Sequence, residues 1–458
     1  MKKPKRKLGQ PKEWVRPRIN IEWVEEDMTS YSTTGTLIDL FTETPHFRDF
    51  SRCLPKRVSN NSYPTEVFAL TLMSSFLHGQ DSIDDQEEYE DEPGMESVLG
   101  KLPGPRATGD WLRDFTDDGR KQLNYFLHQQ AMSYRKKIAK DKPLIIDMDS
   151  TSHVQYGDKM EGCDWNYKKE WALDSLVCFD EVGLCHAMDL RPGNTSSNQG
   201  SVPMLEQVSR DLRVKDEKYF RADSAFCTEA MFRACMRLGY KFTITAHDGW
   251  TNWQAEKEQI TNWKPWNWSK EDLVKAEKRK KPLPECEVGH YLYQPSWSDA
   301  IRFTVCVVRT KSQDLELLNE MGGIWEYYAV ITNRNLFTQA DQSIIEFHRL
   351  RGNSENFIRE EKYNLDLKHF PCLKLSANHA YGLIAMVAHN FLRTIAVIDK
   401  PEKPHFAKKL RRKFIFIPGR LVKHARTLTM KIPVRFRQEV ERLIEAWRYK
   451  PYPAIGSA

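Results

Sequence analysis

The sequence predicts an α/β protein in which a sheet is covered by helices and a helical region precedes it. From Lys142 onward, short apolar runs alternate with helical segments, the pattern of a sheet with helices on its faces. Residues 55–140, in contrast, show helical periodicity in segments that Gly and Pro separate.

Within the sheet region the predicted order is strand, hairpin, helix, strand, helix, strand. PLIIDMDST has strand character, and SLVCFDE and LCHAMDLRPG form a predicted hairpin joined through residues 181–183. Residues 201–212 predict a helix, YFRADSAF a strand, TEAMFRACMRLG a helix and KFTITAH a strand. Connections of this kind place functional groups at strand ends.

This alternation is lost between Asp248 and about Gly323. Five tryptophans lie within residues 250–268, and a charged stretch follows at 270–281. IRFTVCVVRT and WEYYAVITN then have strand character, and a polar helix comes next. The simplest interpretation is a domain inserted between the last sheet strand and that helix. The basic C-terminal region contains an apolar FIFIP run and a predicted final helix at 434–447.

The charge is distributed very unevenly along the 458 residues, whose net charge is +6. Residues 2–18 carry eight Lys or Arg and one Glu, and residues 400–437 carry thirteen Lys or Arg and one acid. Residues 81–96 carry nine acids and no base. A single run of this kind is usually a solvated face. Two basic ends around acidic residues favour a polyanionic partner, nucleic acid above all.

The cysteines, the start of the chain and its apolar segments point to a soluble cytoplasmic protein. The nine cysteines are scattered without any Cys-x-x-Cys pair, which indicates neither a disulfide framework nor a zinc site. The first residues lack the apolar core of a secretory signal. Residues 377–398 are apolar, but Asn, His and Arg interrupt them, so a buried helix is predicted and no membrane partner.

The segment HRLRGNSENFIREEK, residues 348–362, predicts a helix with a charged stripe. With His348 at zero, Arg351 lies at about −60°, Glu355 at about −20° and Lys362 at about −40°. A soluble helix normally carries apolar residues on such a stripe. One acid among three potential cations is the pattern expected of a helix that presents a metal-binding carboxylate to a phosphate backbone. Gly352 inside this helix indicates either a close approach by backbone or ligand, or a simple kink.

Two further carboxylates stand out by position. Asp147 and Asp149 are two residues apart on a strand and therefore face the same side, and Asp223 ends the strand in FRADSAF. Two strand-end aspartates and Glu355 are suitable ligands for two hard cations, which support phosphoryl transfer. Taken singly, a strand-end Asp is more often a turn or cap residue. For Asp147 a second ligand, a hydrogen-bonding support and a bystander remain alternatives.

These motifs resemble the DDE transposases of the IS4 type, most closely the IS1380 family. The matching pieces are IIDMDST followed by VQYG, LRPGNTSSNQG, FRADSAF, and HRLRGNSENFIREEKYNLDLKHFPC followed by SANHAYGLIAMVAHN. They stand in the family order over roughly residues 60–395. The last piece fits the family signature Tyr-x2-Arg-x3-Glu-x6-Lys, except that His348 replaces the Tyr.

The resemblance implies an RNase H-like catalytic core, a mixed sheet flanked by helices, with Asp149, Asp223 and Glu355 as the catalytic, metal-binding triad. It implies two Mg²⁺ ions, with Mn²⁺ as a substitute, and DNA phosphate contacts from Arg351 and Lys362. His348 occupies a third DNA-contact position. Related enzymes stack a flipped base on a tryptophan. The tryptophans in or beside the insertion are Trp250, Trp253, Trp263, Trp266, Trp268, Trp297 and Trp325.

With this resemblance the chain divides into six parts, in which a helical N-terminal domain precedes the core and a mostly β insertion interrupts it. They are a basic N-terminal arm (1–54), a helical DNA-binding domain (55–140), the first part of the core (141–247), the insertion (248–324), the second part of the core (325–399) and a basic C-terminal region (400–458).

The implied function is cut-and-paste transposition. The protein is expected to bind the terminal inverted repeats of an insertion sequence as a homodimer in a synaptic complex. Metal-dependent cleavage of double-stranded DNA and strand transfer into target DNA follow, at the nucleoid in the cytoplasm. The alternatives are a metal-dependent nuclease on the same fold and a catalytically inactive DNA-binding derivative. The missing Cys and His spacing disfavours a zinc nucleic-acid module.

Overall fold

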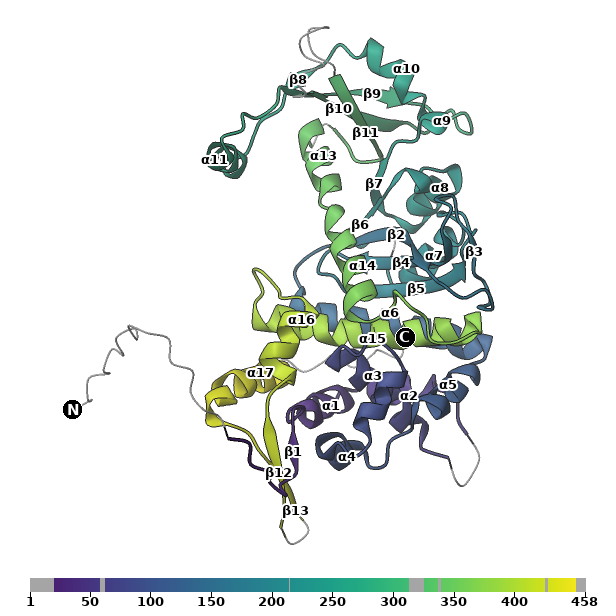
Figure 1. Ribbon diagram of the computed structural model, residues 1–458. Helices are drawn as coiled ribbons and strands as arrows, with labels where there is room; N and C mark the ends of the chain where they lie inside the picture. Colours follow the sequence, from purple (N-terminus) through teal and green to yellow (C-terminus); the bar gives the residue numbers. More distant parts are fainter. Residues whose placement is uncertain are drawn as a thin grey trace, which may run out of the picture.

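A large mixed sheet forms the centre of the molecule (Figure 1). The computed structural model describes residues 20–57, 62–213, 215–312, 325–336, 339–424 and 427–449. Among these residues the sheet has ten strands, in the order β3-β4-β2-β6-β7-β11-β10-β9-β8, with β5 paired to β4. The predicted α/β class is therefore confirmed. The strands are β2 (Leu144–Val154), β3 (Asp164–Trp165), β4 (Trp171–Asp180), β5 (Cys185–Pro192), β6 (Lys218–Ala222), β7 (Lys241–Thr245), β8 (Lys264–Pro265), β9 (Cys286–Tyr293), β10 (Phe303–Lys311) and β11 (Trp325–Thr332).

Strand β2 lies between an antiparallel and a parallel neighbour. It runs antiparallel to β4 and parallel to β6, where Met148 pairs with Ala222. Because the two strands run in the same direction, the residues that follow this pair are neighbours, where β6 ends and β2 continues. Those residues are Asp149 and Asp223.

The turn between β4 and β5 is fixed by one buried carboxylate. Asp180 accepts hydrogen bonds from the backbone N–H groups of Val182 (3.0 Å) and Leu184 (2.8 Å). Gly183 completes the turn with φ +88°, a conformation that suits glycine. The hairpin predicted through residues 181–183 is confirmed. The predicted helices and strands that follow are also present, as α7 (Ser201–Ser209), β6, α8 (Glu229–Leu238) and β7.

The segment predicted as a mostly β insertion extends the main sheet. Strand β11 pairs with β7 through Val330 and Thr245, and β10 and β9 continue outward from it. The described part of the segment also contains α9 (Asp248–Thr251), α10 (Trp253–Glu256), η3 (Lys257–Gln259) and α11 (Lys270–Arg279). It is thus mixed rather than mostly β. Helix α11 buries none of its residues and projects from the sheet (Figure 1).

Helix α15 (Leu375–Asp399) joins the sheet to the N-terminal helices. It packs against β5 on one side and against α3, α5 and α6 on others. By length and apolarity it is, within the described residues, the one helix that meets the criteria for a membrane span, and 89% of its most apolar window is buried inside the protein. The predicted buried helix is confirmed.

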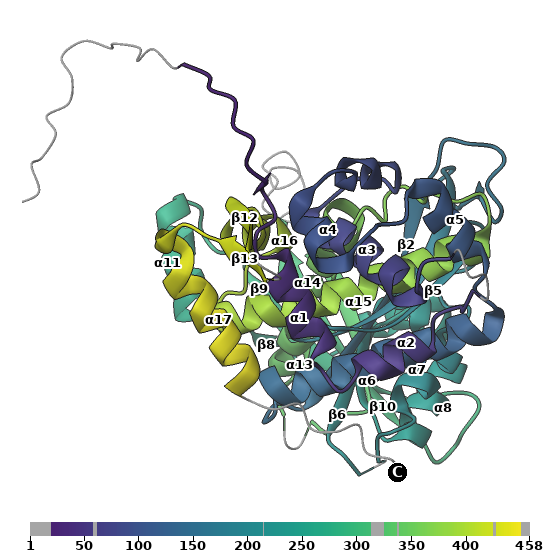
Figure 2. The ribbon, with the colours of Figure 1, turned by 90° about the horizontal axis from the view of Figure 1, so that it is seen from below.

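The N-terminal helices share one hydrophobic core with α15 and the β4–β5 hairpin. Helices α1 to α5 lie on the side of α15 that faces away from the sheet, whereas α6 packs against both α15 and β5 (Figures 1 and 2). The part of the predicted arm 1–54 that is described includes two helices of this core, so residues 34–52 are not an arm; residues 1–19 lie outside the described residues. The helices are α1 (Thr34–Thr42), α2 (Phe47–Arg52), α3 (Thr65–His78), η1 (Asp84–Tyr89), α4 (Pro93–Leu99), α5 (Pro105–Arg113) and α6 (Asp117–Ile138).

The C-terminal region packs against the same core. Arg411 donates hydrogen bonds to the carbonyls of Phe76 and Leu77 at the end of α3 (2.8 Å each). Trp447 donates to the carbonyl of Leu40 (3.1 Å). These bonds tie the described C-terminal elements to α1 and α3. The elements are α16 (Ala407–Leu410), η4 (Arg411–Ile415), η5 (Val434–Phe436), α17 (Arg437–Tyr449) and a small sheet of β1 (Met28–Thr29), β12 (Gly419–His424) and β13 (Thr427–Lys431).

The β4–β5 turn allows a test of this packing. A Cβ at position 183 would lie 2.5 Å from the Phe357 ring and would have to adopt φ +88°. We expect Gly183→Ala to lower the free energy of unfolding by about 3 kcal/mol in chemical denaturation. The control Gly157→Ala meets no atom within 4 Å and should change it by less than about 0.5 kcal/mol. Equal effects of the two substitutions would contradict this account of the turn.

Candidate active site

Asp147 and Asp149 face the same side of β2, as their spacing predicts. Ile146 and Met148 point into the core on the opposite face. Asp147 is 2% exposed, and both its oxygens accept from Arg221 on β6 (Nε–Oδ1 2.6 Å, Nη2–Oδ2 2.7 Å). Burial raises the pKa of Asp147 to about 6 against the lowering effect of Arg221. With both oxygens held by Arg221, this carboxylate is placed as a support for the strand pair.

Asp149 lies in the middle of β2, beside the end of β6, and Asp223 directly follows β6. The Asp223 carboxylate accepts from the backbone N–H of Ala225 (2.9 Å) and caps the short helix η2 (Ser224–Phe226). Burial raises the pKa of Asp149 to about 6; the positive charge of Arg351 lowers it and the negative charge of Asp223 raises it further. The two carboxylates are therefore close enough to repel each other.

The charged segment that follows is two helices, not one. Helix α13 (Asp341–Arg349) ends before Leu350, and α14 begins at Gly352 and ends at Asn364. Between them the backbone N–H of Arg351 donates a hydrogen bond to the carbonyl of His348 (2.9 Å). This bond spans three residues, as in a 3₁₀ turn, instead of the four of an α-helix. The prediction of one continuous helical stripe is wrong at this turn. A Cβ on Gly352 would meet nothing within 4 Å, so the protein backbone does not approach it closely.

The break sends His348 and Arg351 in different directions. The His348 side chain is 1% exposed and contacts the hydroxyl oxygens of Thr245 and Thr243 (3.1 Å each). Burial lowers the pKa of His348 to about 3. The DNA contact predicted at this position is therefore corrected: this neutral, interior ring braces α13 against β7.

Arg351 supplies the positive charge of the site. Its Nη1 lies 2.9 Å from Oδ2 of Asp149. Burial lowers the pKa of Arg351, but the charges of Asp149 and Asp223 outweigh this effect and raise it. The guanidinium thus compensates the aspartates where two negative charges would otherwise meet.

Helix α14 carries Glu355 and Lys362 two turns apart. Glu355 is exposed in the first turn, and Lys362 donates from Nζ to the carbonyl of Ser152 at 2.7 Å. Lys362 therefore reaches the segment of β2 just beyond Asp149. Burial lowers the pKa of its ammonium group.

The predicted triad fits divalent cations by the chemistry of its side chains, but its members do not form a metal-binding cluster among the described residues. An all-oxygen set of Asp149, Asp223 and Glu355 has the donors that Mg²⁺ prefers. Within the described residues no three His, Cys, Asp or Glu side chains lie close enough together to hold a metal ion. The structure thus brings Asp149 and Asp223 together and pairs Asp149 with Arg351, whereas no interaction among the described residues joins Glu355 to either aspartate.

Sequence reasoning missed two residues of this site. Arg221 precedes Asp223 by two residues as Asp147 precedes Asp149, and the structure pairs Asp147 with Arg221 in register. Matched spacing on two strands was the available signal.

Glu361 lies three and four residues after Ile358 and Phe357, on the buried face of α14, and is 0% exposed. Helical periodicity was the signal there.

The seven tryptophans in or beside the insertion mainly serve packing. The Arg309 guanidinium lies between the rings of Trp263 and Trp325, 4.2 and 4.6 Å from their centroids. Trp266 and Trp297 stack in the same way on Arg349 and Arg233. Trp250 is the most exposed of the seven, at 42%.

Glu361 makes stability depend on pH. Neither carboxylate oxygen has a hydrogen-bond partner among the described residues, and burial raises the pKa of Glu361 to about 8. Its folded pKa exceeds the unfolded one, so the charged form opposes folding. This loss of stability is absent below about pH 4.5, grows as the pH rises, and is complete above about pH 8.

We therefore expect Glu361→Gln to stabilise the protein at pH 8 by on the order of 2 kcal/mol and to leave its stability at pH 5 nearly unchanged. Denaturation at both pH values measures this difference. Glu326→Gln, the same change at an exposed strand position, is the matched control and should change little at either pH. A pH-independent effect of Glu361→Gln would refute the assignment.

Comparison with known protein families accords with this geometry. A family model described as Transposase DDE domain group 1 matches residues 36–444, a span that includes every residue of the acidic site. No curated protein matches the sequence.

Proposed function

This chain belongs to the family of the transposase DDE domain group 1, and from that premise we propose that it cuts and joins DNA at the ends of an insertion sequence of the IS1380 type. The observation that carries the proposal is that Asp149 on β2 lies beside Asp223, which directly follows the parallel strand β6, with Arg351 paired to Asp149. Glu355 follows on the next helix turn. An acid pair with an adjacent guanidinium suits a phosphodiester substrate and a cation.

Asp149, Asp223 and Glu355 are the residues that would hold two Mg²⁺ ions, for which Mn²⁺ would substitute. Bound there, such ions activate the attacking oxygen and stabilise the leaving oxygen of a phosphodiester. The protein contributes the positions of the carboxylates. The Asp147–Arg221 pair holds β2 and β6 together, and Arg221 also donates to the carbonyl of Phe347 on α13 (2.8 Å).

Arg351 and Lys362 orient the scissile strand in this proposal. Both lie beside β2, one at Asp149 and the other at Ser152. Two cations separated along one strand can contact successive phosphates of a DNA backbone. When Arg351 turns from Asp149 to a phosphate, it frees that carboxylate for a cation.

The finer parts of the proposal follow the family resemblance. The protein would bind terminal inverted repeats as a homodimer, act on target DNA in a second step, and work at the nucleoid in the cytoplasm. Its basic N- and C-terminal segments would bind DNA backbone. A nuclease without strand transfer is the second candidate, and the absence of joined products with a target plasmid would favour it. Metal-dependent cleavage of end DNA would exclude an inactive DNA-binding derivative.

Glu355→Ala tests the acidic site. We expect strand cleavage of end DNA to fall by at least about a thousandfold, while the affinity for the same DNA stays within about threefold, because an exposed side chain is removed without disturbing the core. Gel-based cleavage and anisotropy titrations measure the two quantities. Glu346→Ala, an exposed acid on α13, should cleave like wild type. Wild-type cleavage by Glu355→Ala would overturn the site assignment.

The dependence of binding on salt tests the partner. Contacts with six or more phosphates release counterions, so an increase in salt from about 50 to 200 mM should weaken DNA binding by about a thousandfold or more. The slope of log affinity against log salt concentration gives the number of phosphates contacted. An affinity that does not change with salt would contradict the nucleic-acid assignment.

A further inference from the structure

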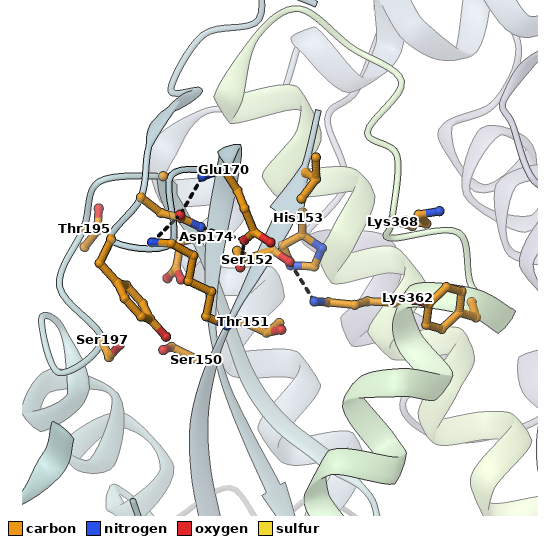
Figure 3. A pocket seen from close by; sticks show the side chains of 16 residues that line it. Ser150, Thr151, Ser152, His153, Glu170, Asp174, Thr195, Ser197, Lys362 and Lys368 are labelled. Carbon is orange, nitrogen blue, oxygen red and sulfur yellow. Dashed lines mark hydrogen bonds between the residues drawn. The ribbon is translucent and has the colours of Figure 1, made fainter. Parts of the chain in front are cut away.

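The basic residues of the C-terminal region lie apart from the cations of the acidic site. Lys362 borders β2, where it donates to the carbonyl of Ser152 beside a small polar cavity (Figure 3). The two-stranded ribbon of β12 and β13 instead projects on the side of α15 that faces away from the main sheet, at the lower end of the molecule in Figure 1. A surface at this position can contact a partner without entering the acidic site.

One face of this ribbon is basic and polar. In an antiparallel ribbon, residues opposite each other and those two positions further along point to the same side. The three pairs that share this face are Arg420–Lys431, Val422–Thr429 and His424–Thr427. All of these residues except the half-buried Val422 are exposed. Residues 419–424 and 427–431 include no Asp or Glu, so the ribbon itself offers its cations no acidic partner.

An acidic segment from the other end of the chain lies against the ribbon. Residues 22–27 carry four acids and no base, and they lead into β1, which pairs with β12. Oε1 of Glu26 lies 2.8 Å from Nη1 of Arg420. Oδ2 of Asp27 lies 3.8 Å from Nζ of Lys423. The segment therefore places carboxylates on the ribbon where an anionic partner would bind.

These contacts are of a kind that another anion can replace. The side chains of Arg420 and Glu26 remain 45% and 40% exposed, and residues 20–27 are exposed throughout. Ion pairs between exposed side chains add little to stability. A guanidinium group binds a phosphate with two parallel hydrogen bonds. A phosphate can therefore take the place of the Glu26 carboxylate on Arg420.

We propose that the basic face of the β12–β13 ribbon binds duplex DNA away from the acidic site, and that Glu26 occupies the phosphate position on Arg420 when DNA is absent. A two-stranded ribbon fits into the major groove of B-DNA. Arg420 and Lys431, which face each other across the ribbon, would contact phosphates, and the threonine hydroxyls lie on the same face. The inference rests on the proposed function for its DNA partner.

Binding of the full-length protein to a labelled duplex of arbitrary sequence tests the ribbon. Anisotropy titrations at several salt concentrations give the affinity and its salt dependence. We expect Arg420→Ala and Lys431→Ala each to weaken binding by about tenfold at about 0.1 M salt and to lower the salt slope by about one, because each removes one phosphate contact. Arg420→Lys keeps the charge and should retain most of the affinity. Unchanged affinity and slope in the two alanine variants would overturn the proposal.

Glu26→Gln tests the competing carboxylate. It should tighten duplex binding by about threefold in the wild-type background, the size of one exposed ion pair, and leave it unchanged in the Arg420→Ala background. The matched control Glu206→Gln removes the same charge from an exposed pair with Arg237, and its effect should not depend on the residue at position 420. Equal tightening by Glu26→Gln in both backgrounds would refute the role of Glu26.

Single-stranded DNA of the same length tests whether the partner is a duplex. A ribbon that enters a groove contacts two strands, so Arg420→Ala should weaken duplex binding more than single-strand binding. Equal losses for the two would contradict the duplex assignment.

Cleavage assays keep this proposal distinct from the proposed function. If the wild type cleaves end DNA in a metal-dependent manner while the ribbon variants bind duplex like the wild type, the ribbon assignment fails and the transposase function stands. If the ribbon variants bind more weakly and the wild type shows no metal-dependent cleavage, the ribbon assignment stands and the proposed function fails.

Discussion

The acidic site depends on a buried ion pair between two strands. Asp147 and Arg221 face each other in register on β2 and β6, with two hydrogen bonds between them and almost no exposure to solvent. Removing one partner of such a pair is strongly destabilising, because it leaves the other charge buried and uncompensated. The pair fixes β2 against β6 two residues before Asp149 on one strand and Asp223 after the other. A third hydrogen bond from Arg221 reaches Phe347 and connects the helix that precedes Arg351.

Arg351 compensates the charges that this arrangement brings together. Asp149 and Asp223 repel each other where β6 ends beside β2, and burial adds to the cost of ionising Asp149. The guanidinium of Arg351 offsets both effects by pairing with Asp149. The same group is a good ligand for a phosphate. When a substrate phosphate and a cation bind, two pairs can therefore replace the Arg351–Asp149 pair: Arg351 with the phosphate, and the aspartates with the cation. Neither aspartate is then left without a compensating positive charge.

Local patterns in the sequence predicted the strands, the β4–β5 hairpin and the buried helix, because each depends on periodicity or turn chemistry within a few residues. The helix break was not predictable in this way. Residues 348–355 fit helical spacing throughout. At the break itself, Leu350 and Arg351 keep right-handed helical backbone angles, so no residue type marks the break. The direction of His348 depends on Thr243 and Thr245, about a hundred residues earlier. The shared sheet of the inserted segment depends likewise on the distant pairing of β7 with β11.

The packing around α15 sets limits on how this protein can meet DNA. The N-terminal helices, the β4–β5 hairpin and the C-terminal helix share one core around α15, and Arg411 links the ends of α3 and α14 through the carbonyls of Leu77 and Asn364. A region of residues 55–140 cut out of this core would expose the apolar faces that now pack on α15. The helical region and the acidic site are thus parts of one packed body. The distance between the helical region and the acidic site is consequently set by the fold rather than by a flexible linker.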